Sequence, residues 1–516
     1  MSARQARPAR GRQLANRFIL AFVVVLALAG LYGVAGLSHA IVLTATPPPA
    51  PAGRLAVSSA LVACPAPGSA GVTGGNLAEA SAPASTGSGQ VALTALNPAA
   101  KTEPPEPVNT APQPGQLTVK TIRKVPVVPS KVATMPSMAG GAVPTSVARG
   151  GLILSATGSD AQGLDVEQLG PDGQPTARCQ APGSDFWFVG PEAIKQHTEL
   201  YLMNADSTPT DAQVSVQTDS GPLLGTPDSG IVVPPHAMII QSLDKLVHSA
   251  RAAAFHVTTS TGRVVAAIRE SSSATKPGIW LPVAQQPATT QVLTGLPATT
   301  GTRELYITVP GGAAARVRVT AVTPRGSYQP TGGSGISLLG HLTTGVSIPS
   351  LSGFPGSIKI SANVPVTAVL ELSGGPPGAP GAFIAGSDAI TEKGVVAASP
   401  TGSGGTTQLV LSAPGQAASV RIVAAAPGSA LTGQPGQVVH IAARSATKVR
   451  VSLPKHDAKA TLMAIVVTPL PGSGPVYAAR LAVAGGSVLT VLPVVSSPTT
   501  IELANVRQSL VSVLGS

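Results

Sequence analysis

The chain has 516 residues, a formal net charge of +11 and only 11% charged residues. Because 57 glycines and 50 prolines interrupt any long helical period, short strands joined by tight turns are expected, with cores built from Val, Leu, Ile and Ala. Aromatic residues make up 3% of the chain and no basic stripe interleaves with them, which excludes a nucleic-acid groove.

The first 38 residues predict a membrane anchor. Five arginines give residues 1–17 the character of a basic cytoplasmic tail, and residues 18–38 form an uncharged run of 21 residues. As a transmembrane helix rising about 1.5 Å per residue, this run spans the roughly 30 Å hydrocarbon layer. The next charge is Arg54, so we expect a single-pass protein of the cell membrane with its N-terminus inside and its bulk extracytoplasmic.

A cleaved signal peptide is the alternative for the same segment, because Ser38 and Ala40 offer small residues at the right spacing. The apolar region of a signal peptide normally runs for only about 7 to 15 residues, which favours the uncleaved signal anchor. In either case the bulk of the chain leaves the cytoplasm.

A proline-rich stalk follows the span. We assign residues 39–56 to a linker and residues 57–195 to a partly disordered proline-rich region with a small β domain, since residues 44–150 hold 17 of the 50 prolines. Two strand-like pieces, residues 91–96 and 117–122, are expected to belong to this domain.

The chain has two cysteines, Cys64 and Cys179, in similar Pro- and Gly-bearing settings. A single pair on the translocated side of a membrane predicts a disulfide, which would close the small β domain. Two unpaired buried thiols are the alternative. A structural zinc site is excluded because no histidine lies at short spacing from either cysteine.

Three consecutive aromatic residues, Phe186, Trp187 and Phe188, stand out in so aromatic-poor a chain. The functional interpretation is a binding platform that stacks a sugar or anchors a partner. The structural interpretation follows from strand alternation, which sends Phe186 and Phe188 into a core while Trp187 seals the junction with the first repeat. Alternation accounts for two of the three rings, so the structural interpretation is favoured.

A block of about 105 residues recurs three times in the rest of the chain. It opens at Glu199, at Glu304 and, weakened, at Gln408, and each opening precedes a polar turn and an alternating run typical of a hairpin. A unit near 100 residues can bury its own core, unlike the short units of a solenoid. The β repeats are assigned to residues 196–283, 284–388 and 389–516.

The expected fold class is therefore mainly β, and the repeats admit two architectures. Strands at about 8 to 12-residue spacing predict three tandem immunoglobulin-like β-sandwich repeats. The competing architecture is a β-propeller, in which each unit splits into two four-stranded blades and residues 500–503 close the ring.

Motifs that carry chemistry are scarce. The chain lacks a G-x-S-x-G elbow, a Walker loop, an H-E-x-x-H helix and an EF-hand pattern, and its eight histidines are scattered. Asp160, Asp165 and Glu167 cluster beside two glycines, but they supply too few ligands for calcium in one loop, so a solvated turn is expected. We expect no catalytic residue, metal or cofactor.

A family resemblance covers nearly the whole exported part. Besides the anchor, stalk and aromatic segment, it rests on residues 155–168, 199–204 and 232–235, which resemble an actinobacterial family of membrane-anchored exported proteins of unknown function. The resemblance implies a high-GC Gram-positive envelope and neighbouring genes for membrane glycosyltransferases, and it brings no catalytic residues. The family's asparagine-proline turn is Asn204-Ala205 here, which loosens that turn.

These features predict a non-catalytic, membrane-anchored extracytoplasmic scaffold or accessory protein of the cell envelope, partnering a membrane enzyme of glycan assembly such as a glycosyltransferase. The alternative is a protein that binds cell-wall polysaccharide, supported mainly by the three aromatic residues. A hydrolase would need a convergent Ser/His/Asp set that a sequence cannot reveal.

Overall fold

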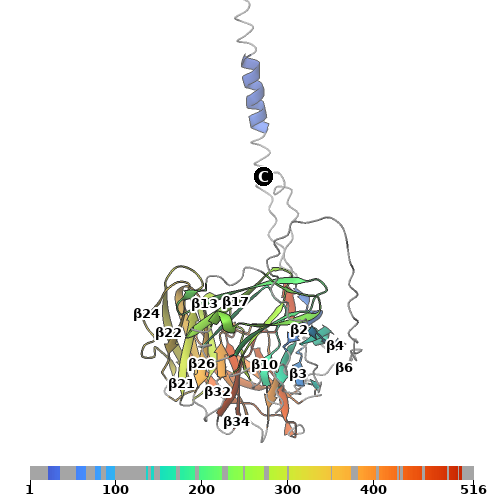
Figure 1. Ribbon diagram of the computed structural model, residues 1–516, viewed down its shortest axis with the longest axis vertical. Coiled ribbons are helices and arrows are strands. Elements are labelled where there is room, and N and C mark those ends of the chain that lie inside the picture. The colour runs from blue at the N-terminus through green and yellow to red at the C-terminus, as the bar shows by residue number, and fades with distance from the viewer. Residues whose placement is uncertain are drawn as a thin grey trace, which may run out of the picture. The chain divides into compact units, whose positions relative to one another are not determined.

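The computed structural model of the protein is mainly β-structure (Figure 1). It describes residues 21–34, 54–65, 76–82, 89–98, 135–136, 141–143, 151–169, 175–191, 197–223, 230–247, 250–271, 278–298, 301–349, 351, 353–373, 382–401, 406–426, 429, 434–455, 459–484, 487–497 and 499–502. The chain divides into two units, one of residues 56–501 and one of residues 1–55 with 502–516.

The N-terminal unit contains a helix over residues 21–34, with every residue exposed. No helix in the described part of the chain is both long and apolar enough to cross a membrane. The ends of the predicted span, residues 18–20 and 35–38, lie outside the described residues, as do the expected strand over residues 117–122 and most of the stalk.

Within the described part of residues 56–501, the strands follow one connectivity four times. We number these repeats module 1 to module 4. Module 1 contains β2 (Ser59–Cys64), β3 (Asn76–Ala80), β4 (Gly89–Ala95), β5 (Asn97–Pro98), β6 (Met135–Pro136), β7 (Gly141–Val143), β8 (Leu152–Gly158), β9 (Asp165–Leu169) and β10 (Pro175–Arg178). Module 2 contains β11 (Asp185–Pro191), β12 (His197–Asn204), β13 (Thr210–Thr218), β14 (Gly221–Pro222), β15 (Ile231–Val233), β16 (Ala237–Ser242), α2 (Asp244–Val247), β17 (Ala252–Thr261), β18 (Val265–Ser271) and β19 (Gly278–Leu281).

The other two modules repeat this plan. Module 3 contains β20 (Ala288–Leu296), β21 (Thr302–Thr308), β22 (Ala315–Thr323), β23 (Gly326–Tyr328), β24 (Ile336–Leu338), β25 (Thr343–Ser347), β26 (Gly356–Ser373) and β27 (Ala382–Ala385). Module 4 contains β28 (Gly394–Pro400), β29 (Thr406–Ala413), β30 (Ala418–Ala425), β31 (Gln437–Ile441), β32 (Ser445–Arg450), β33 (Leu462–Pro469), β34 (Tyr477–Ala484) and β35 (Ser487–Pro493).

Each module has two sheets, and the strands of the two sheets are interleaved along the chain. In module 4 the first sheet has the order β28-β33-β30-β31 and the second has the order β32-β29-β34-β35. Module 1 has the same arrangement, with β2-β8-β4-β6 and β10-β9-β3-β7. In module 3 the 18-residue strand β26 belongs to both sheets, because its first half pairs with β20 and β22 and its second half with β21 and β27.

This strand order does not confirm the immunoglobulin-like topology. In an immunoglobulin constant domain the first two strands share a sheet, whereas here they lie in different sheets. Modules 1 and 4 do contain two four-stranded sheets each, as the propeller alternative expects, but the two sheets of a module interleave along the chain and are not two consecutive blades. The segment expected to close a propeller contains β36 (Thr500–Glu502), which pairs with β1 (Arg54–Ala56).

The predicted boundaries differ from the modules in two respects. The region assigned to a stalk and a small β domain, residues 57–195, contains a complete module with the same strand order as the three predicted repeats. Its last strand, β11, belongs to module 2, because β11 pairs along its whole length with β17 and places Phe188 opposite Phe255.

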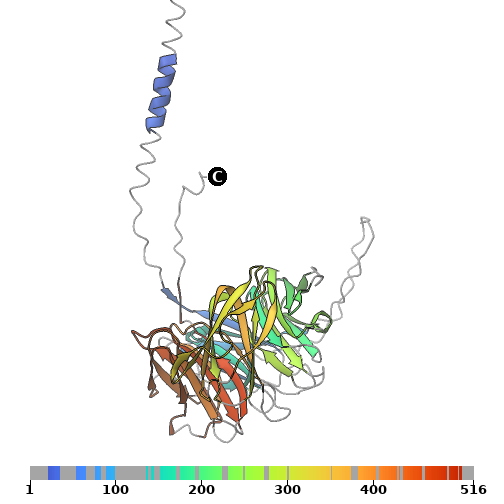
Figure 2. The same ribbon diagram turned by 90° about the vertical axis from the view of Figure 1, so that its left-hand side faces the viewer.

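The modules pack in a closed cycle, which buries apolar faces between them as well as inside them. The first sheet of module 1 packs on the second sheet of module 2, where Ala63 and Ile153 join Tyr201 and Met203 in one apolar cluster. Equivalent clusters join modules 2 and 3 and modules 3 and 4. The first sheet of module 4 then packs on the second sheet of module 1, so the first and last modules lie side by side (Figure 2).

Candidate functional site

A cavity of about 530 Å³ lies where the four modules meet. Its walls include Arg178 of module 1, Trp280 of module 2, Phe383 of module 3 and Val491 of module 4. These residues lie in β10, β19, β27 and β35, the last strand of each module, and β10, β19 and β35 are edge strands of their sheets.

The repeated connectivity explains why these strands converge. In every module the segment just after the last strand forms a β-bridge to the first strand of the same module. The bridges are Ala63 to Gln180, Trp187 to Ala284, Leu293 to Gly386, and Gly394 to Ser496. The same local geometry therefore brings the chain to the cavity four times.

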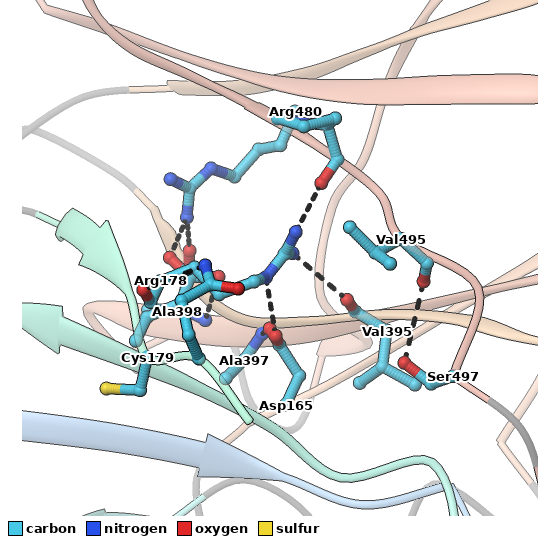
Figure 3. Close-up of polar contacts among 12 residues, drawn as sticks. Asp165, Arg178, Cys179, Val395, Ala397, Ala398, Arg480, Val495 and Ser497 are labelled. Atoms are coloured by element: carbon cyan, nitrogen blue, oxygen red, sulfur yellow. Dashed lines mark hydrogen bonds and ion pairs between the residues drawn. The ribbon is translucent and has the colours of Figure 1, made fainter. Parts of the chain in front are cut away.

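Arg178 lines the cavity on the side of modules 1 and 4. Figure 3 shows its polar contacts. Its Nε donates to Asp165 Oδ1 at 2.7 Å, its Nη1 donates to the carbonyl of Pro493 at 2.6 Å, and its Nη2 donates to the carbonyl of Val395 at 3.5 Å. Burial opposes the charge on Arg178, but the attraction of Asp165 and Glu167 outweighs it and raises the pKa of the guanidinium.

The predicted disulfide between Cys64 and Cys179 is confirmed. It ties the end of β2 to the residue that follows Arg178, and the Cys179 amide donates to the carbonyl of Val166 at 2.9 Å. The bridge therefore ties the second sheet of module 1, whose edge strand carries Arg178, to the first sheet.

A second ion pair lies deeper in the same junction. Arg480 of β34 donates from Nη1 to Glu167 Oε2 at 2.7 Å, and both side chains are completely buried. Arg480 Nη1 also donates to the carbonyl of Ala398, while the Ala398 amide donates to Glu167 Oε1 at 3.3 Å. Burial raises the pKa of Glu167, and the attraction of Arg480 offsets only part of that effect.

The solvated turn predicted for Asp160, Asp165 and Glu167 is wrong. Their exposed fractions are 3%, 6% and 0%. The physical reason is that Arg178 and Arg480 neutralise Asp165 and Glu167, and the Ala397 amide adds a 2.8 Å hydrogen bond to Asp165 Oδ2. Among the described residues no group of His, Cys, Asp and Glu side chains is placed to hold a metal ion.

The predicted aromatic platform has no exposed ring. Phe186, Trp187 and Phe188 are 6%, 5% and 0% exposed, and all three belong to the apolar cluster that joins modules 2 and 3. Trp187 stacks on His256, with ring centroids 3.9 Å apart and an angle of 11° between the planes. His256 in turn contacts Asp185 at 2.9 Å, so the aromatic segment is fixed within the fold.

Sequence reasoning missed two neighbouring acids near the junction of modules 2 and 3, the buried Glu270 and the half-buried Glu371. Tyr306 Oη donates to Glu371 Oε2 at 3.1 Å. Burial, with a smaller contribution from the charge of Glu371, raises the pKa of Glu270 to about 8. Burial also raises the pKa of Glu371. The sequence did contain a signal for Glu270, because a glutamate is unusual in a largely buried strand such as β18.

These contacts describe a junction that joins modules. The guanidinium groups of Arg178 and Arg480 contact carboxylates and backbone carbonyls of the chain itself, an arrangement that fixes neighbouring modules and leaves the cavity between them.

The model of a family of unknown function, DUF5719, matches residues 132–452, which extend from module 1 into module 4. A search of the curated proteins finds no match.

Proposed function

The chain belongs to this family of unknown function, and we propose that it is a non-catalytic, membrane-anchored scaffold or accessory protein of the cell envelope. One observation carries the proposal: the most deeply buried charged groups, Glu167 and Arg480, pair with each other across two modules. The carboxylate and guanidinium of this pair hold the two modules together and are not available to react with a substrate.

The disulfide supports an extracytoplasmic location. Disulfides persist in oxidising compartments and are rare in the cytoplasm, so the Cys64–Cys179 bridge fits the outer side of a membrane. We propose that residues 18–38 are the uncleaved anchor, supported by their apolar sequence, the arginines before them and the helix over residues 21–34.

The proposed partner is a membrane enzyme of glycan assembly, such as a glycosyltransferase. The support for it is the family resemblance of the sequence together with the modular build, which offers the sheet edges and loops of four modules for contact. Binding of cell-wall polysaccharide is the second candidate, and the cavity where the four modules meet favours it.

A pull-down of the tagged full chain from detergent-solubilised membranes tests the proposal. The expected result is a membrane protein recovered in stoichiometric amount. A matched control is the double variant Glu167→Leu and Arg480→Leu, which alters the junction without leaving an unpaired buried charge. Recovery of no stoichiometric membrane protein with the native chain would contradict the scaffold proposal. Retention on purified wall polysaccharide would instead support the second candidate.

A further inference from the structure

We propose that the cavity between the four modules binds a neutral saccharide. This inference goes beyond the scaffold proposal, which requires no ligand in the cavity. The volume of about 530 Å³ lies within the range of about 300 to 1,000 Å³ that small-molecule sites occupy.

The walls of the cavity combine apolar surface with polar groups in the way that sugars require. Trp280 is partly exposed and lines the cavity together with Phe383, which offers aromatic surface to the C–H face of a sugar ring. Edge strands β10, β19 and β35 contribute residues to the lining, and edge strands present backbone amides and carbonyls that hydroxyl groups can both donate to and accept from.

Two residues of the lining, Gln285 and Ser387, carry buried polar atoms without a hydrogen-bond partner in the described part of the chain. Ser387 is 6% exposed, and its buried Oγ has no hydrogen-bond partner within the described part of the chain. The buried Oε1 of Gln285 is likewise without a partner there, whereas Gln285 Nε2 donates to Asp388 Oδ1 at 2.6 Å. Buried polar atoms are normally paired, so a lone hydroxyl and a lone amide oxygen in residues that line one cavity favour a ligand that supplies hydroxyl groups.

The charges of the lining favour a neutral ligand over an anion. Arg178 is the charged donor in the wall, and its guanidinium is occupied by Asp165 and by the carbonyls of Pro493 and Val395. Asp388 supplies a carboxylate, which would repel a phosphate or a carboxylate but accepts hydrogen bonds from hydroxyl groups.

Isothermal titration of the full chain tests the assignment. The protein is held in a detergent without a sugar headgroup, and the probes are glucose, mannose, galactose, arabinose, N-acetylglucosamine and disaccharides of these sugars. We expect saturable binding of at least one probe with a single site per chain. Ser387→Ala should weaken that binding about three- to tenfold, the loss of one neutral hydrogen bond.

Ser399→Ala is the matched control. Ser399 lies in β28, is completely buried and also has an unpartnered Oγ in the described structure, but it does not line the cavity. Its substitution should leave the dissociation constant unchanged. The proposal is overturned if no probe binds at millimolar concentration, or if Ser387→Ala binds as tightly as the native chain. Either result would leave the pull-down expected for a scaffold unaffected.

Discussion

Glu167 and Arg480 are 313 residues apart in the chain and form an ion pair of 2.7 Å in which both side chains are completely buried. Glu167 lies in β9 of module 1 and Arg480 lies in β34 of module 4, so the contact joins the first and last modules. An apolar cluster of both modules surrounds the same junction. Removing one partner would leave an unpaired buried charge, which makes the pair a sensitive probe of the closed cycle.

The disulfide should contribute strongly to the stability of module 1. Replacing both cysteines, Cys64→Ala with Cys179→Ala, should lower the free energy of unfolding by on the order of 4 to 5 kcal/mol, because the bridge closes a loop with a sequence separation of 115. Urea denaturation measures the loss. In the native chain, neither cysteine should react with an alkylating reagent until a reductant is added. Full labelling of the unreduced protein would refute the bridge.

The aromatic segment should behave as a core. Phe188→Ala should cost about 3 to 5 kcal/mol in the free energy of unfolding, because the side chain is completely buried and its removal leaves a cavity. Trp187→Ala should cost on the order of 3 kcal/mol or more for the same reason. Tyr328→Ala is the matched control, since Tyr328 is 37% exposed and its loss should change stability by no more than about 0.5 kcal/mol. A thermal melt unaltered by the double change Phe186→Ala and Phe188→Ala would contradict this account.

Stability should depend on the protonation of Glu270. Its pKa is raised from 4.5 to about 8 in the folded chain, so the folded state holds the proton more tightly than the unfolded state does. The contribution of protonated Glu270 to the stability of the fold is complete below pH 4.5 and is lost as the pH rises through about 8. Glu270→Gln lacks this loss, so its stability relative to the native chain should increase by on the order of a few kcal/mol between these values. Urea midpoints measured across the range provide the test. If the difference in stability between Glu270→Gln and the native chain stays constant with pH, the buried carboxyl of Glu270 is not the source of the pH dependence.

The proposed anchor predicts an intact N-terminus in the mature protein. The length of residues 18–38 fits the bilayer better than it fits the short apolar region of a signal peptide. Intact-mass measurement and N-terminal sequencing of the membrane fraction should therefore detect a chain that retains this segment. A mature chain that begins at Ile41 would show that the segment is a cleaved signal peptide.

The sequence contained enough information to locate most strands of the last three modules. Their alternating apolar runs are local patterns, and the openings at Glu199, Glu304 and Gln408 lie in β12, β21 and β29. Module 1 was predicted as a small β domain but not as a fourth repeat, because residues 99–134 separate β5 from β6 and break the period of about 105 residues. The boundary after residue 195 was misplaced because the pairing of β11 with β17 is a long-range contact.

The candidate site was less accessible to sequence reasoning. The two cysteines were informative because, in a chain predicted to be exported, each cysteine of a single pair has only the other as a partner. Asp165 and Glu167 carried no such signal, because a carboxylate beside glycines is usually solvated and their arginine partners come from other strands. The cavity arises from the repeated connectivity of four modules, which no single segment of the chain encodes.

A double-mutant cycle on Glu167 and Arg480 tests the closed cycle of modules most directly. Each single change, Glu167→Leu or Arg480→Leu, should cost about 3 to 5 kcal/mol in the free energy of unfolding. The double change should cost less than the sum, with a coupling energy on the order of 1 to 3 kcal/mol. The exposed pair Asp206 and Arg263, which are 2.8 Å apart, should give less than about 1 kcal/mol in the same experiment. If the losses of the two single variants sum to the loss of the double variant within about 0.5 kcal/mol, the contact between the first and last modules is contradicted.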